Sequence, residues 1–82
     1  MNDFVITFAT SHHAIKANIR LNSFVEIIPT PREISSECGF SLLAKMCELQ
    51  ILKQKLEKQN LKYAKIYKIE TRKGAKIYEE IS

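Results

Sequence analysis

Residues 24–44 read FVEIIPTPREISSECGFSLLA, a polar stretch between two short apolar segments. The apolar segments at its two ends are rich in β-branched and aromatic residues or alternate with polar ones, which is typical of strands. Pro29 and Pro31 cannot donate to a strand ladder, so the polar residues from there to Gly39 are predicted to form a loop. This part of the chain is therefore expected to be a strand, an irregular loop and a second strand.

On both sides of this stretch the spacing of apolar residues predicts further elements. Phe4, Ile6 and Phe8 alternate with Val5 and Thr7, which predicts a strand with one strongly apolar face. Thr10 or Ser11 can cap the helix that follows. The expected elements are strands at 4–8, 24–28, 40–44 and 63–70, helices at 11–22 and 45–59, a hairpin turn at 71–74, and a fifth strand or lysine-bearing tail at 75–81.

The order strand, helix, strand, strand, helix, strand, with short connections, is the βαββαβ pattern of ferredoxin-like domains. We therefore predict an α+β fold, a ferredoxin-like sandwich with two helices on one face of a four-stranded antiparallel sheet. An extra C-terminal strand can extend this sheet. The predicted domain covers residues 1–70, and residues 71–82 form either a hairpin strand or a basic tail.

This topology has a consequence for the loop, because the third strand starts at the edge of the sheet where the first strand ends. The loop at 29–37 and the thiol of Cys38 are then expected beside Thr10, Ser11 and His12. A helix N-terminus carries partial positive charge and free N–H groups, and both favour a thiolate. His12 is either a proton donor or acceptor near the thiol or an exposed residue of the first helical turn.

The loop itself supplies groups that suit an anionic sulfur. Arg32 adds a full positive charge, or it forms an ion pair with Glu33 or Glu37. Ser35 and Ser36 can hydrogen-bond an anion, and Gly39 leaves space beside the sulfur.

The segment Ile28–Phe40, IPTPREISSECGF, resembles the signature of the selenium/sulfur carrier protein-like domain family. The resemblance covers most of the chain, including the opening strand, Thr10-Ser11-His12 and the strand from Tyr63, but not residues 71–82. It implies that Cys38 holds sulfur or selenium as a persulfide or selenosulfide, with Arg32 balancing the anion. Glu37 replaces the small residue usual before this cysteine, and a carboxylate there opposes thiolate formation.

Composition and charge exclude several classes of protein. The chain has 82 residues with 13 Lys plus Arg and 9 Asp plus Glu, and its longest apolar run is too short to cross a membrane. Residues 1–41 carry net charge −1 and residues 42–82 carry +5, so the basic excess is expected to be a solvated lysine-rich surface. We predict no metal site, because the two cysteines and two adjacent histidines lack a zinc spacing. Cys47 is expected to pack in the core or at its edge, from the second helix.

The leading hypothesis is a small cytoplasmic carrier or accessory protein that is not an enzyme and needs no cofactor. It would take sulfur or selenium onto Cys38 from a donor protein and pass it to an acceptor protein. The alternative is a binding or assembly module that uses the same loop or a sheet edge, as in a homodimer, with Cys38 in a structural role. Nucleic-acid binding is the least favoured hypothesis, and no membrane partner is expected.

Overall fold

The computed structural model describes residues 2–37 and 39–82. The elements, in chain order, are β1 (Asn2–Thr7), α1 (Ser11–Leu21), the 3₁₀ turn η1 (Asn22–Phe24), β2 (Glu26–Pro29), β3 (Phe40–Cys47), α2 (Leu49–Lys58), β4 (Lys65–Arg72) and β5 (Ala75–Glu80). No helix in the described part of the chain has the length and apolar character needed to cross a membrane.

All five strands join one antiparallel sheet in the order β2-β3-β1-β4-β5. As expected, β3 lies between β1 and β2 and runs opposite to both. The sheet has a fifth strand beyond the four of the predicted sandwich, because residues 75–80 return along β4. An extra C-terminal strand was one of the two predicted alternatives for this segment. Lys73 and Gly74 both have positive φ, 51° and 81°, which is the conformation of a two-residue hairpin turn that suits the twist of the flanking strands.

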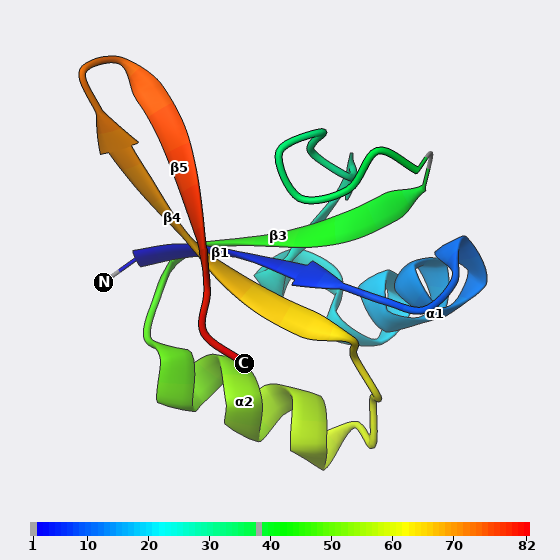
Figure 1. The fold of residues 1–82 in the computed structure, drawn as a ribbon. Coiled ribbons are helices and arrows are strands. Elements are labelled where there is room, and N and C mark those ends of the chain that lie inside the picture. The colour runs from blue at the N-terminus through cyan, green and yellow to red at the C-terminus, as the bar shows by residue number, and fades with distance from the viewer. Residues whose placement is uncertain (1, 38) are drawn as a thin grey trace.

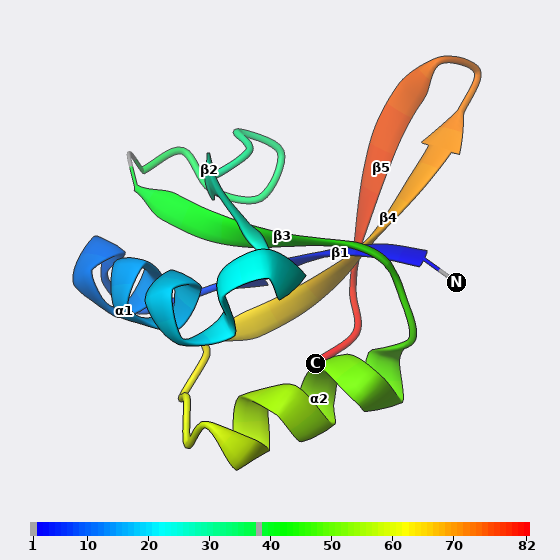
Figure 2. The same ribbon diagram turned by 180° about the vertical axis from the view of Figure 1, so that it is seen from behind.

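Both helices cover one face of the sheet, and the main core lies between the two layers (Figure 1). Phe4, Ile6 and Leu42 from the sheet pack with Leu21 of α1 and with buried leucines of α2. The connection between β2 and β3 lies on the opposite face, as the view from behind also shows (Figure 2). The two layers therefore leave that second face for the loop that contains the predicted site.

The boundary between β3 and α2 differs from the prediction of a helix over 45–59. β3 continues to Cys47, and α2 begins at Leu49. One extra residue of β3 is inserted opposite the start of β1, and Met46 there has φ 54° and donates its N–H to Asp3 Oδ1 at 2.8 Å. This β-bulge breaks the two-residue alternation of the strand, so the sequence there no longer resembles a strand. Cys47 is buried in the core as predicted, but from β3.

The helix ends follow local capping chemistry. Thr10 is the N-cap of α1, and its Oγ1 accepts from His13 N–H at 3.2 Å, so Thr10 rather than Ser11 caps the helix. After α2, Asn60 adopts φ 54° and Leu61 N–H donates to the carbonyl of Leu56 at 2.9 Å. This closing hydrogen bond ends α2 near Asn60, as the sequence indicates.

Substitutions at two neighbouring residues of α2 can test which side of this helix faces the core. Leu52 is fully buried, whereas Ile51 is 42% exposed. Leu52→Ala is expected to lower the free energy of unfolding by about 2–5 kcal/mol, because it removes core contacts and leaves a cavity. Ile51→Ala, the matched control, should cost less than about 1 kcal/mol. Urea denaturation measures both, and equal losses would contradict the helix orientation.

Candidate functional site

The ends of the loop between β2 and β3 are joined by two hydrogen bonds. Thr30 N–H donates to the Gly39 carbonyl at 3.0 Å, which continues the β2–β3 ladder by one step. The Thr30 and Ser41 hydroxyls lie 2.6 Å apart, and Ser41 is fully buried. The side-chain bond satisfies a hydroxyl that the sheet buries, so the loop is held to the sheet where it begins and ends.

Inside the loop, the chain folds back on itself in a short turn. The carbonyl of Pro31 accepts from the N–H groups of Ile34 and Ser35, at 3.0 and 3.1 Å. Ser35 Oγ in turn accepts from Glu37 N–H at 3.2 Å. These bonds give the loop a defined conformation, and none of them uses the Ser35 hydroxyl proton.

The N-terminus of α1 lies against this loop, as the topology predicts. A Cβ placed on Gly39 would lie 3.6 Å from Ser11 Oγ and 4.0 Å from Thr30 Oγ1. These are ordinary van der Waals distances, so Gly39 brings the loop close to the first residue of the helix without being sterically required there. Ser11 and Gly39, far apart in sequence, therefore become neighbours.

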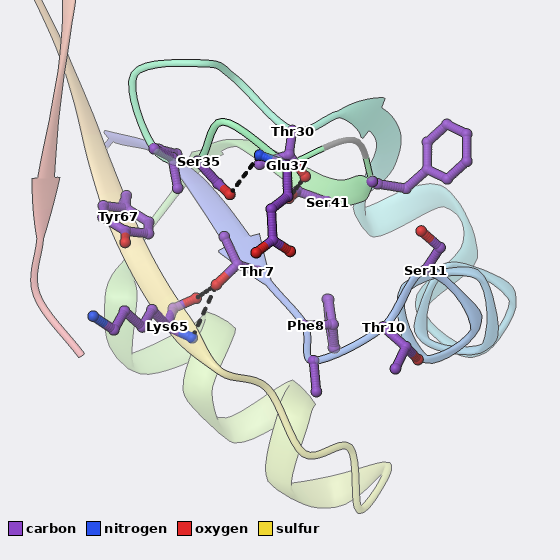
Figure 3. A pocket seen from close by; sticks show the side chains of 14 residues that line it. Thr7, Phe8, Thr10, Ser11, Thr30, Ser35, Glu37, Ser41, Lys65 and Tyr67 are labelled. Atoms are coloured by element: carbon purple, nitrogen blue, oxygen red, sulfur yellow. Dashed lines mark hydrogen bonds between the residues drawn. The ribbon is translucent and has the colours of Figure 1, made fainter.

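A hollow of about 280 Å³ opens between the loop, the end of β1, the start of β4 and the beginning of α1 (Figure 3). Hydroxyl-bearing side chains contribute much of its wall. Its lining residues are Thr7, Phe8, Ala9, Thr10, Ser11, Thr30, Ile34, Ser35, Glu37, Gly39, Phe40, Ser41, Lys65 and Tyr67. We call this the inner hollow.

The predicted site residues are divided between three places. Ser11, Ser35 and Gly39 line the inner hollow. They also line a second, outer hollow of about 490 Å³, where Arg32 and Ser36 join them.

His12 lies apart from both hollows, in a shallow groove on the outer surface of α1 with Lys16 and Arg20. Among residues 2–37 and 39–82, the ion pairs do not include Arg32, so the predicted pairing with Glu33 or Glu37 is not seen there.

Cys38, the predicted sulfur-bearing residue, lies outside the described residues. Its two neighbours in the chain, Glu37 and Gly39, line both hollows. The Glu37 side chain extends into the inner hollow rather than away from it (Figure 3). A carboxylate is therefore present in the space where an anionic sulfur group would be expected.

Sequence reasoning missed the wall of the inner hollow that the sheet supplies. Thr7 pairs with Lys65 across β1 and β4, and Thr7 Oγ1 accepts from Lys65 N–H at 3.1 Å. Tyr67 follows on the same face of β4. Lys65 Nζ bonds Glu80 Oε1 at 3.0 Å, and this contact raises the pKa of the lysine. The sequence signal was that side chains alternate between the two faces of the strand at 65–67. This alternation shows which of them face the loop only once the β1–β4 register is known.

The other cysteine is a core residue. Cys47 is a free thiol with 7% of its surface exposed. Burial, and secondarily the nearby Asp3 carboxylate, raise the pKa of this thiol, so it stays protonated at neutral pH. No group of three or more histidine, cysteine or acidic side chains in the described ranges is arranged to hold a metal ion.

Comparison with protein families identifies the chain. The model of the family described as "Putative Se/S carrier protein-like" matches residues 3–68, which is well over half of the sequence. The chain belongs to this family. Comparison with curated proteins found no match, and comparison with solved structures also found none.

The bond between the Thr30 and Ser41 hydroxyls can be tested by a double-mutant cycle. Thr30→Val keeps the side-chain shape but leaves the buried Ser41 hydroxyl without its partner, so it should cost about 1–3 kcal/mol of stability. Ser41→Ala alone should cost less, because Thr30 is partly exposed and can bond water. The double variant should be more stable than the sum of the two losses predicts. Strict additivity in urea denaturation would contradict the bond.

Proposed function

We propose that the protein is a sulfur or selenium carrier or accessory protein that holds a persulfide or selenosulfide on Cys38. The observation that carries the proposal is membership of the Se/S carrier protein-like family, over a range that contains the cysteine. The inner hollow supports it, because both chain neighbours of Cys38 line that hollow together with Ser11 and Ser35. Donor and acceptor proteins are then the partners, and the reducing cytoplasm is the compartment in which the thiol stays available.

We also propose that residues 1–70 form a ferredoxin-like domain, to which residues 71–82 add a hairpin strand. The order β2-β3-β1-β4 and the two helices on one face support this assignment. The domain matters for function because it orients the β2–β3 loop toward the end of β1 and the N-terminus of α1.

The transfer needs no external oxidant. The Cys38 thiolate attacks the terminal sulfur of a donor persulfide, forming a new S–S bond as the donor's own S–S bond breaks. The electron pair of the broken bond leaves with the donor, which becomes a thiolate. In the second step an acceptor thiolate attacks the outer sulfur on Cys38, and Cys38 leaves as a thiolate. Each step exchanges one S–S bond for another.

The residues around the hollow have separate roles in this proposal. Ser35 Oγ accepts from Glu37 N–H, so its proton can be donated to the anionic outer sulfur. The opening turn of α1, capped by Thr10, presents N–H groups and partial positive charge near Gly39. Glu37 acts in the opposite direction, because its carboxylate disfavours a second negative charge nearby. The balance predicts moderate rather than strong thiolate activation.

Sulfur loading is the direct test. After incubation with a cysteine desulfurase and free cysteine, the intact protein should gain the mass of one sulfur atom. Trypsin cleavage after Arg32, Lys45 and Lys53 separates Cys38 from Cys47, so peptide mapping assigns the adduct. Cys38→Ser should abolish the adduct, and Cys47→Ala should retain it, because Cys47 is buried and protonated. No adduct, or an adduct that survives in Cys38→Ser, would exclude the proposed carrier role.

The effect of Glu37 on the thiol is a second test. Glu37→Gln removes the negative charge, so alkylation of Cys38 by iodoacetamide at neutral pH should accelerate several-fold, within the roughly tenfold that one nearby charge produces. The midpoint of the pH–rate profile should move to lower pH, whereas a mere gain in access would raise the rate without moving it. Glu33→Gln is the control, because Glu33 lines neither hollow. Equal effects of both substitutions would contradict the assignment.

A further inference from the structure

β5 forms one edge of the sheet, and its hairpin with β4 projects beyond the rest of the molecule (Figures 1 and 2). An edge strand has unpaired N–H and C=O groups along one side, where a further strand can be added. The opposite edge, β2, is short, since it has four residues and ends at Pro29. β5 has six residues and contains no proline, so it is the edge with more pairing capacity.

The outward groups of β5 can be identified from its pairing with β4. Ile66 N–H donates to the Ser82 carbonyl, and the Ile66 carbonyl accepts from Ile81 N–H, both at 2.9 Å. Backbone groups alternate in direction along a strand, so Ile77 and Glu79 also face β4. The amides and carbonyls of Lys76, Tyr78 and Glu80 therefore face outward, away from the sheet.

The side chains of these three residues on one copy of β5 are complementary to those on a second, antiparallel copy. If a second copy of β5 lies antiparallel with Tyr78 opposite Tyr78, then Lys76 lies opposite Glu80 at both ends of the pairing. Opposite charges and aromatic pairs directly across an antiparallel ladder are both stabilising. The same three residues supply the outward backbone groups, so this register satisfies the hydrogen bonds and the side chains together.

We propose that two copies of this chain associate through β5, in an antiparallel, two-fold symmetric pairing centred on Tyr78. The pairing joins the two five-stranded sheets into one continuous sheet and is independent of sulfur loading. It gives the exposed Ile77 and the partly buried Tyr78 new neighbours across the two-fold axis. In the single chain, Glu80 bonds Lys65 through Oε1, so this carboxylate would be shared between Lys65 and the Lys76 of the second copy.

A charge exchange tests the register. The wild-type protein should show twice the monomer mass by light scattering as its concentration rises toward about 1 mM. Lys76→Glu places like charges opposite each other twice and should give a monomer. The double variant Lys76→Glu/Glu80→Lys restores opposite charges and should recover the dimer. Lys73→Glu makes the same change in net charge in the hairpin turn, outside the paired residues, and should leave the dimer intact.

Circular dichroism checks that each variant keeps the fold. A wild-type protein that stays monomeric over this concentration range would overturn the proposal, as would a Lys76→Glu variant that still dimerises. Failure of the double variant to recover the dimer would overturn the register.

Hydrogen exchange gives an independent readout of the same pairing. The amides of Lys76, Tyr78 and Glu80 should exchange at least tenfold more slowly at high protein concentration, because they become hydrogen-bonded between copies. The amides of Ile77 and Glu79 already face β4 and should change much less. Protection that appears elsewhere in the protein, with no change at the three outward amides, would contradict pairing through β5.

Discussion

β3 is hydrogen-bonded to β1 on one side and to β2 on the other, antiparallel to both, and the position of the candidate site depends on this pairing. Because β3 runs opposite to β1, it must start at the end of the sheet where β1 stops. The loop that leads into β3 therefore lies beside the connection from β1 to α1, and the start of β4 reaches the same place through its pairing with Thr7. A different strand order would separate these segments.

The main hydrophobic core and the candidate site lie on opposite faces of the sheet. The main core lies on the helix-covered face, where Phe4 and Leu42 meet the leucines of α2. The opposite face has Val5 and Ser41, which are also fully buried, and the loop lies over that face. A chain of this size has one substantial core, so a site built on the other face can present polar groups without weakening it. The Thr30–Ser41 bond connects the loop to the folded core, since Ser41 belongs to β3, a strand that also contributes to the core.

Local pattern predicted most of the elements but fewer of their contacts. The helix at 11–22 and the turn at Gly74 were recognisable from capping and glycine, because both depend on neighbouring residues. The end of β3 was not, because the bulge at Met46 depends on Asp3, 43 residues away. The same reason explains which site residues could be predicted. Ser11 and Ser35 were predicted from the topology and the loop motif, whereas placing Lys65 and Tyr67 in the site required knowledge of the β1–β4 register. His12 was assigned from its position beside Ser11, but it faces the outer surface of α1.

In the proposed carrier, the sulfur on Cys38 would occupy the space between the loop and the N-terminus of α1. Backbone amide NMR spectra of the reduced and persulfidated protein compare these two states directly. Chemical-shift changes are expected at Glu37 and Gly39, next to Cys38 in the chain, and also at Thr10 and Ser11, which line the inner hollow beside the loop only in the folded structure. Changes limited to the chain neighbours of Cys38 would contradict this placement.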